Sequence, residues 1–210
     1  MIRDEAQARA FISEWGGAEA IEKLEALGAA LREENERQNL VSRGSLDTMW
    51  IRHFADSAQL LAHVPRGTQG AWFDLGSGAG FPGLVLAVLR PAQPTVLVES
   101  RRRRVDWLEA MKEKLALEKC EIEGKRLELV ESRKAAVISA RAFAPLPKLL
   151  SLSSRFSTAG TYWVLPKGRS AAQEVGELPN AKRKLFHVEQ SLTDDEAGIV
   201  VGKGQLGTGK

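Results

Sequence analysis

Residues 74–83 read Asp-Leu-Gly-Ser-Gly-Ala-Gly-Phe-Pro-Gly and follow a short apolar run that begins at Ala71. The alternate glycines at 76, 78 and 80 let the main chain turn sharply and approach a ligand where a Cβ atom would clash. A helical pattern follows from Phe81, and Pro82 suits the first turn of that helix, whose free N–H groups face the ligand. The stretch therefore predicts a strand-to-helix turn that binds a small molecule.

Two cofactor classes use a turn of this kind. The dinucleotide spacing Gly-x-Gly-x-x-Gly fits residues 78–83, but it starts two residues late for a strand that ends at Leu75. Read from Asp74, the segment fits an acid, an apolar residue and then Gly-x-Gly-x-Gly at every position. That pattern resembles the first motif of class I methyltransferases. There the turn accommodates the methionine portion of S-adenosylmethionine, and the acid binds its amino end directly or through water.

A second carboxylate favours a cofactor that contains adenosine. Glu99 ends the apolar run 95–98, 19 residues beyond Gly80. A carboxylate at that place can accept hydrogen bonds from both ribose hydroxyls of either cofactor, so it does not separate the two classes. A turn that merely connects strand to helix is the third interpretation, and four glycines flanked by two acids argue against it.

From residue 71 onward, short apolar runs alternate with helical patterns. This order predicts an α/β fold with a mostly parallel, doubly wound sheet covered by helices on both faces. The last two of seven predicted strands have no helical pattern between them, which predicts a hairpin. The predicted strands cover residues 71–75, 95–99, 120–123, 135–139, 162–165, 182–189 and 198–202. The predicted helices cover residues 81–89, 102–116 and 146–156.

The sequence divides into an N-terminal helical segment, residues 1–66, packed on a Rossmann-like methyltransferase core, residues 67–210. Within the first segment, helices are expected over residues 4–15, 18–36 and about 46–64. Ser45 is the expected N-cap of the third helix, and Pro65-Arg66-Gly67 then breaks the chain. The Gly-rich tail from Gly202 to Lys210 is expected to fray.

The composition is typical of a folded protein without membrane spans: 43% of the 210 residues are apolar and 27% are charged. A single cysteine, Cys120, excludes an internal disulfide and a cysteine-based metal cluster, and the polar N-terminus predicts a cytoplasmic location. Residues 1–36 hold nine acidic and four basic residues (net −5), which leaves 18 acidic and 26 basic residues (net +8) beyond them. The basic body favours an anionic partner such as nucleic acid, although ordinary surface charge is the alternative.

The run from Asn39 to Lys167 is similar to the glucose-inhibited division protein B family, the bacterial small-subunit ribosomal RNA guanine-N7 methyltransferases. The resemblance covers about two thirds of the chain. Its most selective parts are the Gly-Phe-Pro-Gly ending of the glycine turn and the Arg-His-x-x-Asp-Ser segment. The matching pieces are Asn39-Leu40, Trp50-Ile51-Arg52-His53-Phe54-Ala55-Asp56-Ser57, Asp74 to Gly83, Glu99-Ser100 with Arg103-Arg104, Ser139 to Ala144, and Leu165 to Gly168.

This resemblance implies a class I methyltransferase fold, S-adenosylmethionine as methyl donor and no metal. It implies transfer to N7 of a guanine, position 527 in common rRNA numbering, in the decoding-region loop of 16S rRNA. The partner would be 16S rRNA, the small ribosomal subunit or an assembly intermediate, with the protein a monomer that does not bind membranes. Another RNA substrate, an NAD-dependent oxidoreductase and a non-catalytic RNA-binding module are the rival functions.

The family's cofactor contacts map onto Gly76, Phe81, Leu127-Glu128 and Arg141. Where the family tends to have Arg-Ala-Glu, this chain has Arg126-Leu127-Glu128. If the main chain of Leu127 binds the adenine edge, its larger side chain should matter little. If the side chain faces the adenine ring, the pocket would be tighter. With the two acids and the glycine turn, the candidate cofactor residues are Asp74, Gly76, Ser77, Gly78, Phe81, Glu99, Leu127, Glu128 and Arg141.

Guanine N7 carries a lone pair and no proton, so attack on the sulfonium methyl group requires no general base. Catalysis then rests on alignment, and we expect positioning roles for three residues, His53, Arg141 and Lys167. Structural pairing of His53 with Asp56, and surface salt bridges for the two cations, are the alternatives. Phe81, Phe143 and Trp163 are candidates to stack on a base. The candidate RNA contacts are Arg52, Arg101, Arg103, Arg104 and Lys167, with a solvated helix face as the alternative for the arginine cluster.

Overall fold

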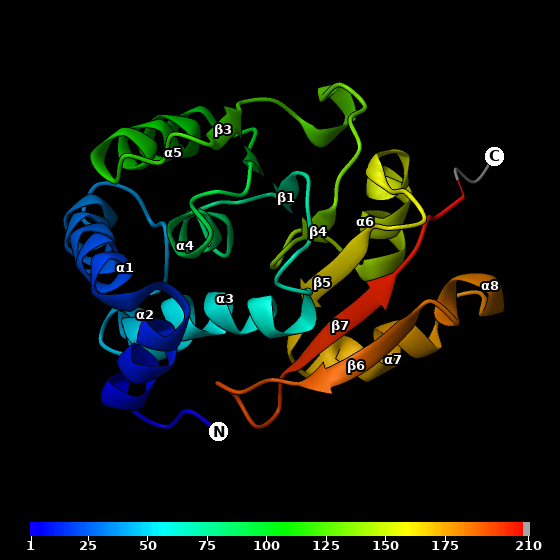
Figure 1. Ribbon diagram of the computed structural model, residues 1–210, viewed down its shortest axis with the longest axis horizontal. Coiled ribbons are helices and arrows are strands. Elements are labelled where there is room, and N and C mark those ends of the chain that lie inside the picture. Colours follow the sequence, from blue (N-terminus) through cyan, green and yellow to red (C-terminus); the bar gives the residue numbers. More distant parts are fainter. Residues whose placement is uncertain (208–210) are drawn as a thin grey trace.

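The computed structural model describes residues 1–207, in which a seven-stranded sheet lies between helices (Figure 1). The strand order is β3-β2-β1-β4-β5-β7-β6; the first five strands are parallel, whereas β7 runs antiparallel to both of its neighbours. The predicted mostly parallel sheet and its C-terminal hairpin are therefore confirmed. The strands are β1 Trp72–Leu75, β2 Thr95–Val98, β3 Cys120–Glu123, β4 Val137–Ser139, β5 Tyr162–Pro166, β6 Phe186–Gln190 and β7 Gly198–Lys203.

The central strands are apolar on both faces because helices cover both sides of the sheet. All four residues of β1 are buried, and this strand pairs in parallel with β2 and β4. One hydrophobic cluster contains residues of α1, α4 and α5, and a second contains residues of α6 and α7. These helices are α1 Glu5–Asn35, α4 Gly83–Leu89, α5 Arg102–Lys114, α6 Leu146–Ser153 and α7 Ala171–Gly176.

The parallel strands end at one edge of the sheet, and this determines where the candidate site residues meet. β1, β2, β4 and β5 end there at Leu75, Val98, Ser139 and Pro166. The antiparallel β7 begins at the same edge, since its Ile199 pairs with Pro166. The loops after these strands therefore converge at the edge where open α/β sheets bind their ligands.

Helix α1 contains the break that the sequence predicts between residues 15 and 18. Gly17 has φ 65° and ψ −160°, which divides the helix into two segments. The Asp4 side chain caps its N-terminus by accepting a hydrogen bond from the Gln7 N–H group at 2.7 Å. The N-terminal segment packs on the sheet layer, because α1 residues belong to the same hydrophobic cluster as α4.

The helix expected over about residues 46–64 is continuously helical from Met49 to His63, but it is not a single α-helix. The segment is divided into α2 Arg43–Leu46, a π-helical turn η1 Trp50–Ala55, α3 Asp56–Ala58 and a 3₁₀ turn η2 Gln59–His63. The Glu5 carboxylate accepts hydrogen bonds from the N–H groups of Trp50 and Ile51, both at 3.1 Å, and so fixes where η1 begins. Ser45 is no N-cap: Ser42 holds the cap position of α2, and Ser45 binds a histidine of η1.

The C-terminal part holds two further differences from prediction. Residues 182–183 belong to a short helix, α8 Asn180–Arg183, so the sixth strand begins only at Phe186. The expectation of a frayed tail fails as far as Leu206, which is 2% exposed and donates its N–H group to Ser157 Oγ at 3.0 Å. Thr208 to Lys210 lie outside the described residues. Within residues 1–207, no helix has both the length and the apolar character needed to cross a bilayer.

Candidate functional site

The glycine turn between β1 and α4 has the backbone that its sequence predicts. Gly76, Gly78 and Gly80 adopt φ values of 69°, 60° and 98°, in the left-handed region that favours glycine. The N–H groups of Gly76 and Ser77 donate to the Val98 carbonyl at 2.8 and 3.0 Å, which fastens the turn to the end of β2. Side-chain substitutions at the three glycines are thus strained whatever space surrounds them.

Asp74 supports the turn from inside the protein. The residue is fully buried; its Oδ1 accepts a hydrogen bond from Ser139 Oγ at 2.8 Å and its Oδ2 one from the Gly83 N–H group at 3.1 Å. Burial raises the pKa of Asp74, against the lowering effect of these donors. Both oxygens therefore bind the protein and link β1 to β4 and to the start of α4.

Glu99, by contrast, contacts the main chain of the turn itself. Its Oε2 accepts a hydrogen bond from the Gly78 N–H group at 3.0 Å, and its Oε1 accepts from the main chain of Ser100 and Arg101. A carboxylate oxygen has room for more than one donor, so Oε2 can also accept from a ribose hydroxyl. Arg104 Nη1 lies 4.0 Å from the same oxygen. The structure thus brings Glu99 and Arg104 to the glycine turn.

The Leu127-Glu128 pair lies in the 3₁₀ turn η3 Leu127–Leu129, beyond β3. The Leu127 side chain is 3% exposed and packs in the second hydrophobic cluster, and Glu128 is exposed. The carbonyl of Leu127 accepts a hydrogen bond from Arg155. The larger Leu127 side chain is thus accommodated in the protein core.

A cleft of about 890 Å³ opens at the carboxyl ends of β4 and β5. Four distant parts of the chain form its walls. They are the η1 segment with the loop that precedes it, the loop after β4, the loop after β5, and the β6–β7 turn. Phe143 lines the cleft and also lies over the glycine turn, since a Cβ atom on Gly76 would be 2.4 Å from its Cδ2. The cleft and the glycine turn are therefore neighbours that share one aromatic side chain.

His53 and Arg141 meet in this cleft. Arg141 Nη2 lies 3.5 Å from His53 Nδ1; because a guanidinium can only donate, Nδ1 is the acceptor. The proton of the neutral ring is then on Nε2, which lies 2.9 Å from Ser45 Oγ. Burial, aided by the positive charges of Arg141 and Arg52, lowers the pKa of His53 to about 3. His53 is therefore a neutral ring at physiological pH.

Asp56 holds the other side of Arg141. Its Oδ2 accepts a hydrogen bond from Arg141 Nη1 at 3.2 Å, and its Oδ1 accepts from Gln59 and Thr193, each at 2.9 Å. The alternative of a direct His53–Asp56 hydrogen bond is not found within residues 1–207. Instead, Arg141 contacts both side chains and ties this segment to the end of β4. Arg141 therefore has a structural role, and it also lines the cleft.

The aromatic candidates for base stacking divide into two kinds. Phe81 is 2% exposed and stacks on the His53 ring, with centroids 4.8 Å apart and an interplanar angle of 8°. Trp163 is fully buried and donates to the Gly204 carbonyl at 3.0 Å. Base stacking on Phe81 and Trp163 is therefore a wrong prediction, because each ring is already packed inside the protein. Phe143 is the candidate that lines the cleft.

Lys167 enters the cleft from the end of β5. Its Nζ donates to the Ala144 carbonyl at 2.8 Å and to Glu174 Oε2 at 3.0 Å, and 10% of the side chain is exposed. Burial opposes ionisation of Glu174, but donation by Ser170, Lys167 and the Leu146 N–H group lowers its pKa. Lys167 is thus a held cation rather than a free surface charge.

The candidate RNA-contacting cations fall into two groups. Arg52 and Lys167 line the cleft. Arg101, Arg103 and Arg104 lie at the N-terminal end of α5, where Arg103 Nη2 donates to the Arg37 carbonyl at 3.2 Å. The sequence analysis did not single out Glu174, Arg169 or the β6–β7 turn, because their places in the site depend on long-range packing that no local pattern signals. Within residues 1–207, no group of three or more His, Cys, Asp or Glu side chains could hold a metal ion.

Several known proteins are similar to this chain in sequence. The family model of rRNA small subunit methyltransferase G matches residues 20–197. Two relatives carry the name ribosomal RNA small subunit methyltransferase G. The one from Erythrobacter litoralis is 64% identical over 99% of this chain and 100% of its own length. The one from Sphingopyxis alaskensis is 49% identical over 98% of this chain and 89% of its own length.

Among solved structures, an RNA methyltransferase from Salinibacter ruber in complex with S-adenosyl-L-homocysteine has a similar fold. The TM-score is 0.53 at 15% identity, over 71% of this chain and 90% of that one. The predicted class I methyltransferase fold is thereby confirmed. Together with the match over residues 20–197, the high identity over nearly the whole length means that the chain belongs to the rRNA small subunit methyltransferase G family.

Proposed function

We propose that this protein transfers the methyl group of S-adenosylmethionine to N7 of a guanine in the decoding-region loop of 16S rRNA. The observation that carries the proposal is the adjacency of two sites. A glycine turn with the Glu99 carboxylate against it lies beside an 890 Å³ cleft that holds Arg141, His53 and Lys167. Phe143 touches both, so a methyl donor in the first site would reach a base in the second.

The glycine turn fits the nucleoside part of the cofactor. A Cβ atom on Gly78 would meet only two atoms within 4 Å, Arg104 Nη1 at 3.6 Å and the Gly76 carbonyl oxygen at 3.8 Å, so the space beside this residue is open. Glu99 Oε2 faces the same residue with spare acceptor capacity. Glu99 would hold the ribose, and the main chain of Gly76, Gly78 and Phe81 would line the methionine portion.

The cleft suits a reaction that moves no proton at the attacking atom. Guanine N7 attacks with its own lone pair, so the protein's part is to align the base and exclude competing geometries. A neutral His53 agrees with that role, since burial, and next the positive charge of Arg141, oppose its protonation. Arg141 is fixed by Asp56 and by the Arg52 carbonyl, which leaves further N–H groups for a purine oxygen or a phosphate. Lys167 adds a second fixed cation to the lining of the cleft.

The test is transfer of a labelled methyl group from S-adenosylmethionine to RNA. The protein is incubated with 16S rRNA, with small ribosomal subunits and, as controls, with 23S rRNA and bulk tRNA. Label in the small-subunit samples alone is the expected result. Label in tRNA or 23S rRNA only, or binding of NAD but not of S-adenosylhomocysteine in calorimetric titration, would contradict the proposal.

A Glu99→Gln variant tests the cofactor site separately. The amide cannot accept in the same way from both the main chain and a ribose, so we expect the Kd for S-adenosylhomocysteine to rise about tenfold or more. Glu118→Gln, at an exposed position in the loop before β3, is the matched control and should bind normally. Unchanged calorimetric affinity in a Glu99→Gln protein that melts like the parent would remove Glu99 from the site.

A further inference from the structure

The turn between β6 and β7 places an acidic tip, residues Asp194 to Glu196, beside the cleft. Residues 191–197 include three consecutive acids, Asp194, Asp195 and Glu196, in an otherwise basic body. Ser191, Thr193, Asp194 and Ala197 of this turn line the cleft. The Asp194 carboxylate therefore lies in the wall of the cleft in which we propose that RNA binds.

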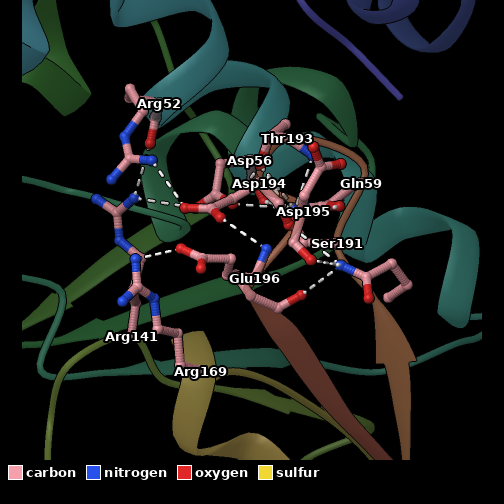
Figure 2. A network of polar contacts seen from close by, with 12 residues as sticks. Arg52, Asp56, Gln59, Arg141, Arg169, Ser191, Thr193, Asp194, Asp195 and Glu196 are labelled. Atoms are coloured by element: carbon pink, nitrogen blue, oxygen red, sulfur yellow. Dashed lines mark hydrogen bonds and ion pairs between the residues drawn. The ribbon is translucent and has the colours of Figure 1, made fainter.

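Two of these acids bind arginines from other elements (Figure 2). Asp194 Oδ2 lies 3.0 Å from Arg52 Nη1, which comes from η1, and Glu196 pairs with Arg169, which comes from η5 Gly168–Ser170. Arg52 lines the cleft directly, and Arg169 lies between Gly168 and Ser170, which also line it. The tip thus contacts two separate segments of the cleft wall.

The base of the turn is fixed, whereas its tip is held only by exposed contacts. Gln59 is 1% exposed and accepts the Leu192 N–H group at 2.7 Å, while Thr193 donates to Asp56. In contrast, the arginine side chains at the tip are 53% and 79% exposed. Exposed ion pairs contribute little to stability and exchange readily with other anions. The tip can therefore release its arginines without disturbing the base of the turn.

We propose that Asp194 and Glu196 act as built-in substitutes for RNA phosphates, and that bound rRNA takes Arg52 and Arg169 from them. A guanidinium binds carboxylate and phosphate oxygens with the same planar set of donors, which makes the exchange chemically direct. This inference rests on the proposed function, because it takes RNA as the ligand of the cleft. It adds Arg169 as an RNA contact and makes the acidic tip an autoinhibitory element that competes with the substrate.

A third acid in the same turn, Asp195, provides a control for this proposal. Asp195 lies between the two pairing acids, is exposed, and makes no ion pair among residues 1–207. Asp194→Asn, Glu196→Gln and Asp195→Asn each remove one negative charge from the same turn, but only the first two free an arginine. Asn at 194 keeps the oxygen that can accept the Glu196 N–H group, now 3.0 Å from Asp194 Oδ1.

The measurement is the Kd for a fluorescein-labelled RNA hairpin with the decoding-region loop sequence, by fluorescence anisotropy at one fixed salt concentration. We expect Asp194→Asn and Glu196→Gln to tighten binding about threefold or more, and Asp195→Asn to change it less than twofold. Arg169→Gln should weaken binding, and adding Glu196→Gln to it should bring no further gain, because the freed arginine is then absent.

Equal tightening by all three acidic variants would mean that bulk charge alone acts, and would overturn the proposal. So would unchanged or weaker binding by both pairing variants in proteins that melt like the parent. If the parent protein binds the hairpin and the variants bind it with the same Kd, only the autoinhibitory role of the tip is refuted. A parent protein that neither binds nor methylates RNA refutes the proposed function itself.

Discussion

His53 shows how one residue's surroundings decide its chemistry. The ring is 7% exposed, stacks on Phe81, and faces Arg141 at its Nδ1 atom. Protonation in the folded state would place a second positive charge against that guanidinium. These surroundings therefore favour a neutral His53 ring that is hydrogen-bonded to Arg141 and orients it. They disfavour a role for His53 in proton transfer near neutral pH.

This environment predicts an acid-dependent loss of stability. Burial lowers the pKa of His53 in the folded protein to about 3, from an ordinary value of 6.5. Between these two pH values, the unfolded chain binds a proton that the folded protein does not. Stability from this residue is present above pH 6.5 and falls as the pH drops toward 3. Between pH 7.5 and pH 5, His53 should account for a loss of about 2 kcal/mol in the free energy of unfolding.

Urea denaturation of the parent and of His53→Gln at the two pH values measures this contribution. The variant is less stable at pH 7.5 because it loses packing, but its further loss at pH 5 should be smaller by that amount. His187→Gln, whose parent side chain is 61% exposed, should behave like the parent protein. The same loss in His53→Gln as in the parent would show that His53 titrates normally in the fold.

Among single residues, the sequence predicts those whose role depends on their neighbours in the chain. The glycines of the turn and Glu99 are recognisable because backbone conformation and strand-end position follow from neighbouring residues. The inward direction of Asp74 is not, because its partners Ser139 and Gly83 are joined to it only in the folded sheet. Glu174 and Arg169 were missed for the same reason.

Among the elements, α1 and the η1 segment show what periodicity can and cannot predict. The interruption near Gly17 is visible in the sequence as a gap between two helical patterns. The π-helical turn of η1 is not visible, because its start depends on Glu5, which is 45 residues away from Trp50. The strands were predicted more closely, since their apolar runs are short, contiguous and bounded by turn residues.

The break in α1 predicts a large penalty for a small substitution. Gly17 has φ 65° and ψ −160°, a conformation nearly restricted to glycine, while a Cβ atom there would meet nothing within 4 Å. Gly17→Ala should therefore destabilise the protein by about 2 kcal/mol through backbone strain alone. Thermal or urea unfolding measures the effect.

Gly44→Ala is the matched control for that substitution. Gly44 lies in helix α2, also with open space at its Cβ position and without a left-handed φ value. Alanine is a better helix former than glycine, so this variant should equal or slightly exceed the parent in stability. Equal stability of Gly17→Ala and Gly44→Ala would mean that the bend in α1 does not require glycine.

For the whole molecule, the sheet edge organises the function. The glycine turn, Glu99, Arg141 and Lys167 follow four different strands, and parallel pairing brings all four to one side. The N-terminal segment supplies a further wall, because Arg52 and His53 line the cleft. These helices are part of the site, and not only a cover for the sheet.

The sequence predicts this arrangement in outline. Alternating strands and helices predict the parallel sheet, the class of ligand site and the final hairpin. The shape of the cleft is not predictable in the same way, since it forms where the η1 segment, two strand-end loops and the β6–β7 turn meet. The acidic tip is the least predictable part, because its ion pair between Arg52 and Asp194 joins residues 142 positions apart.

The central claim is that the cofactor beside Glu99 methylates N7 of one guanine in the cleft. The most direct measurement is borohydride–aniline cleavage of 16S rRNA after incubation with the protein and S-adenosylmethionine, with the cut mapped by primer extension. We predict a single strong stop in the decoding-region loop, at position 527 in common rRNA numbering, that disappears when the cofactor is omitted. A methylated rRNA that resists cleavage there, or is cut at a different guanine, would contradict the account.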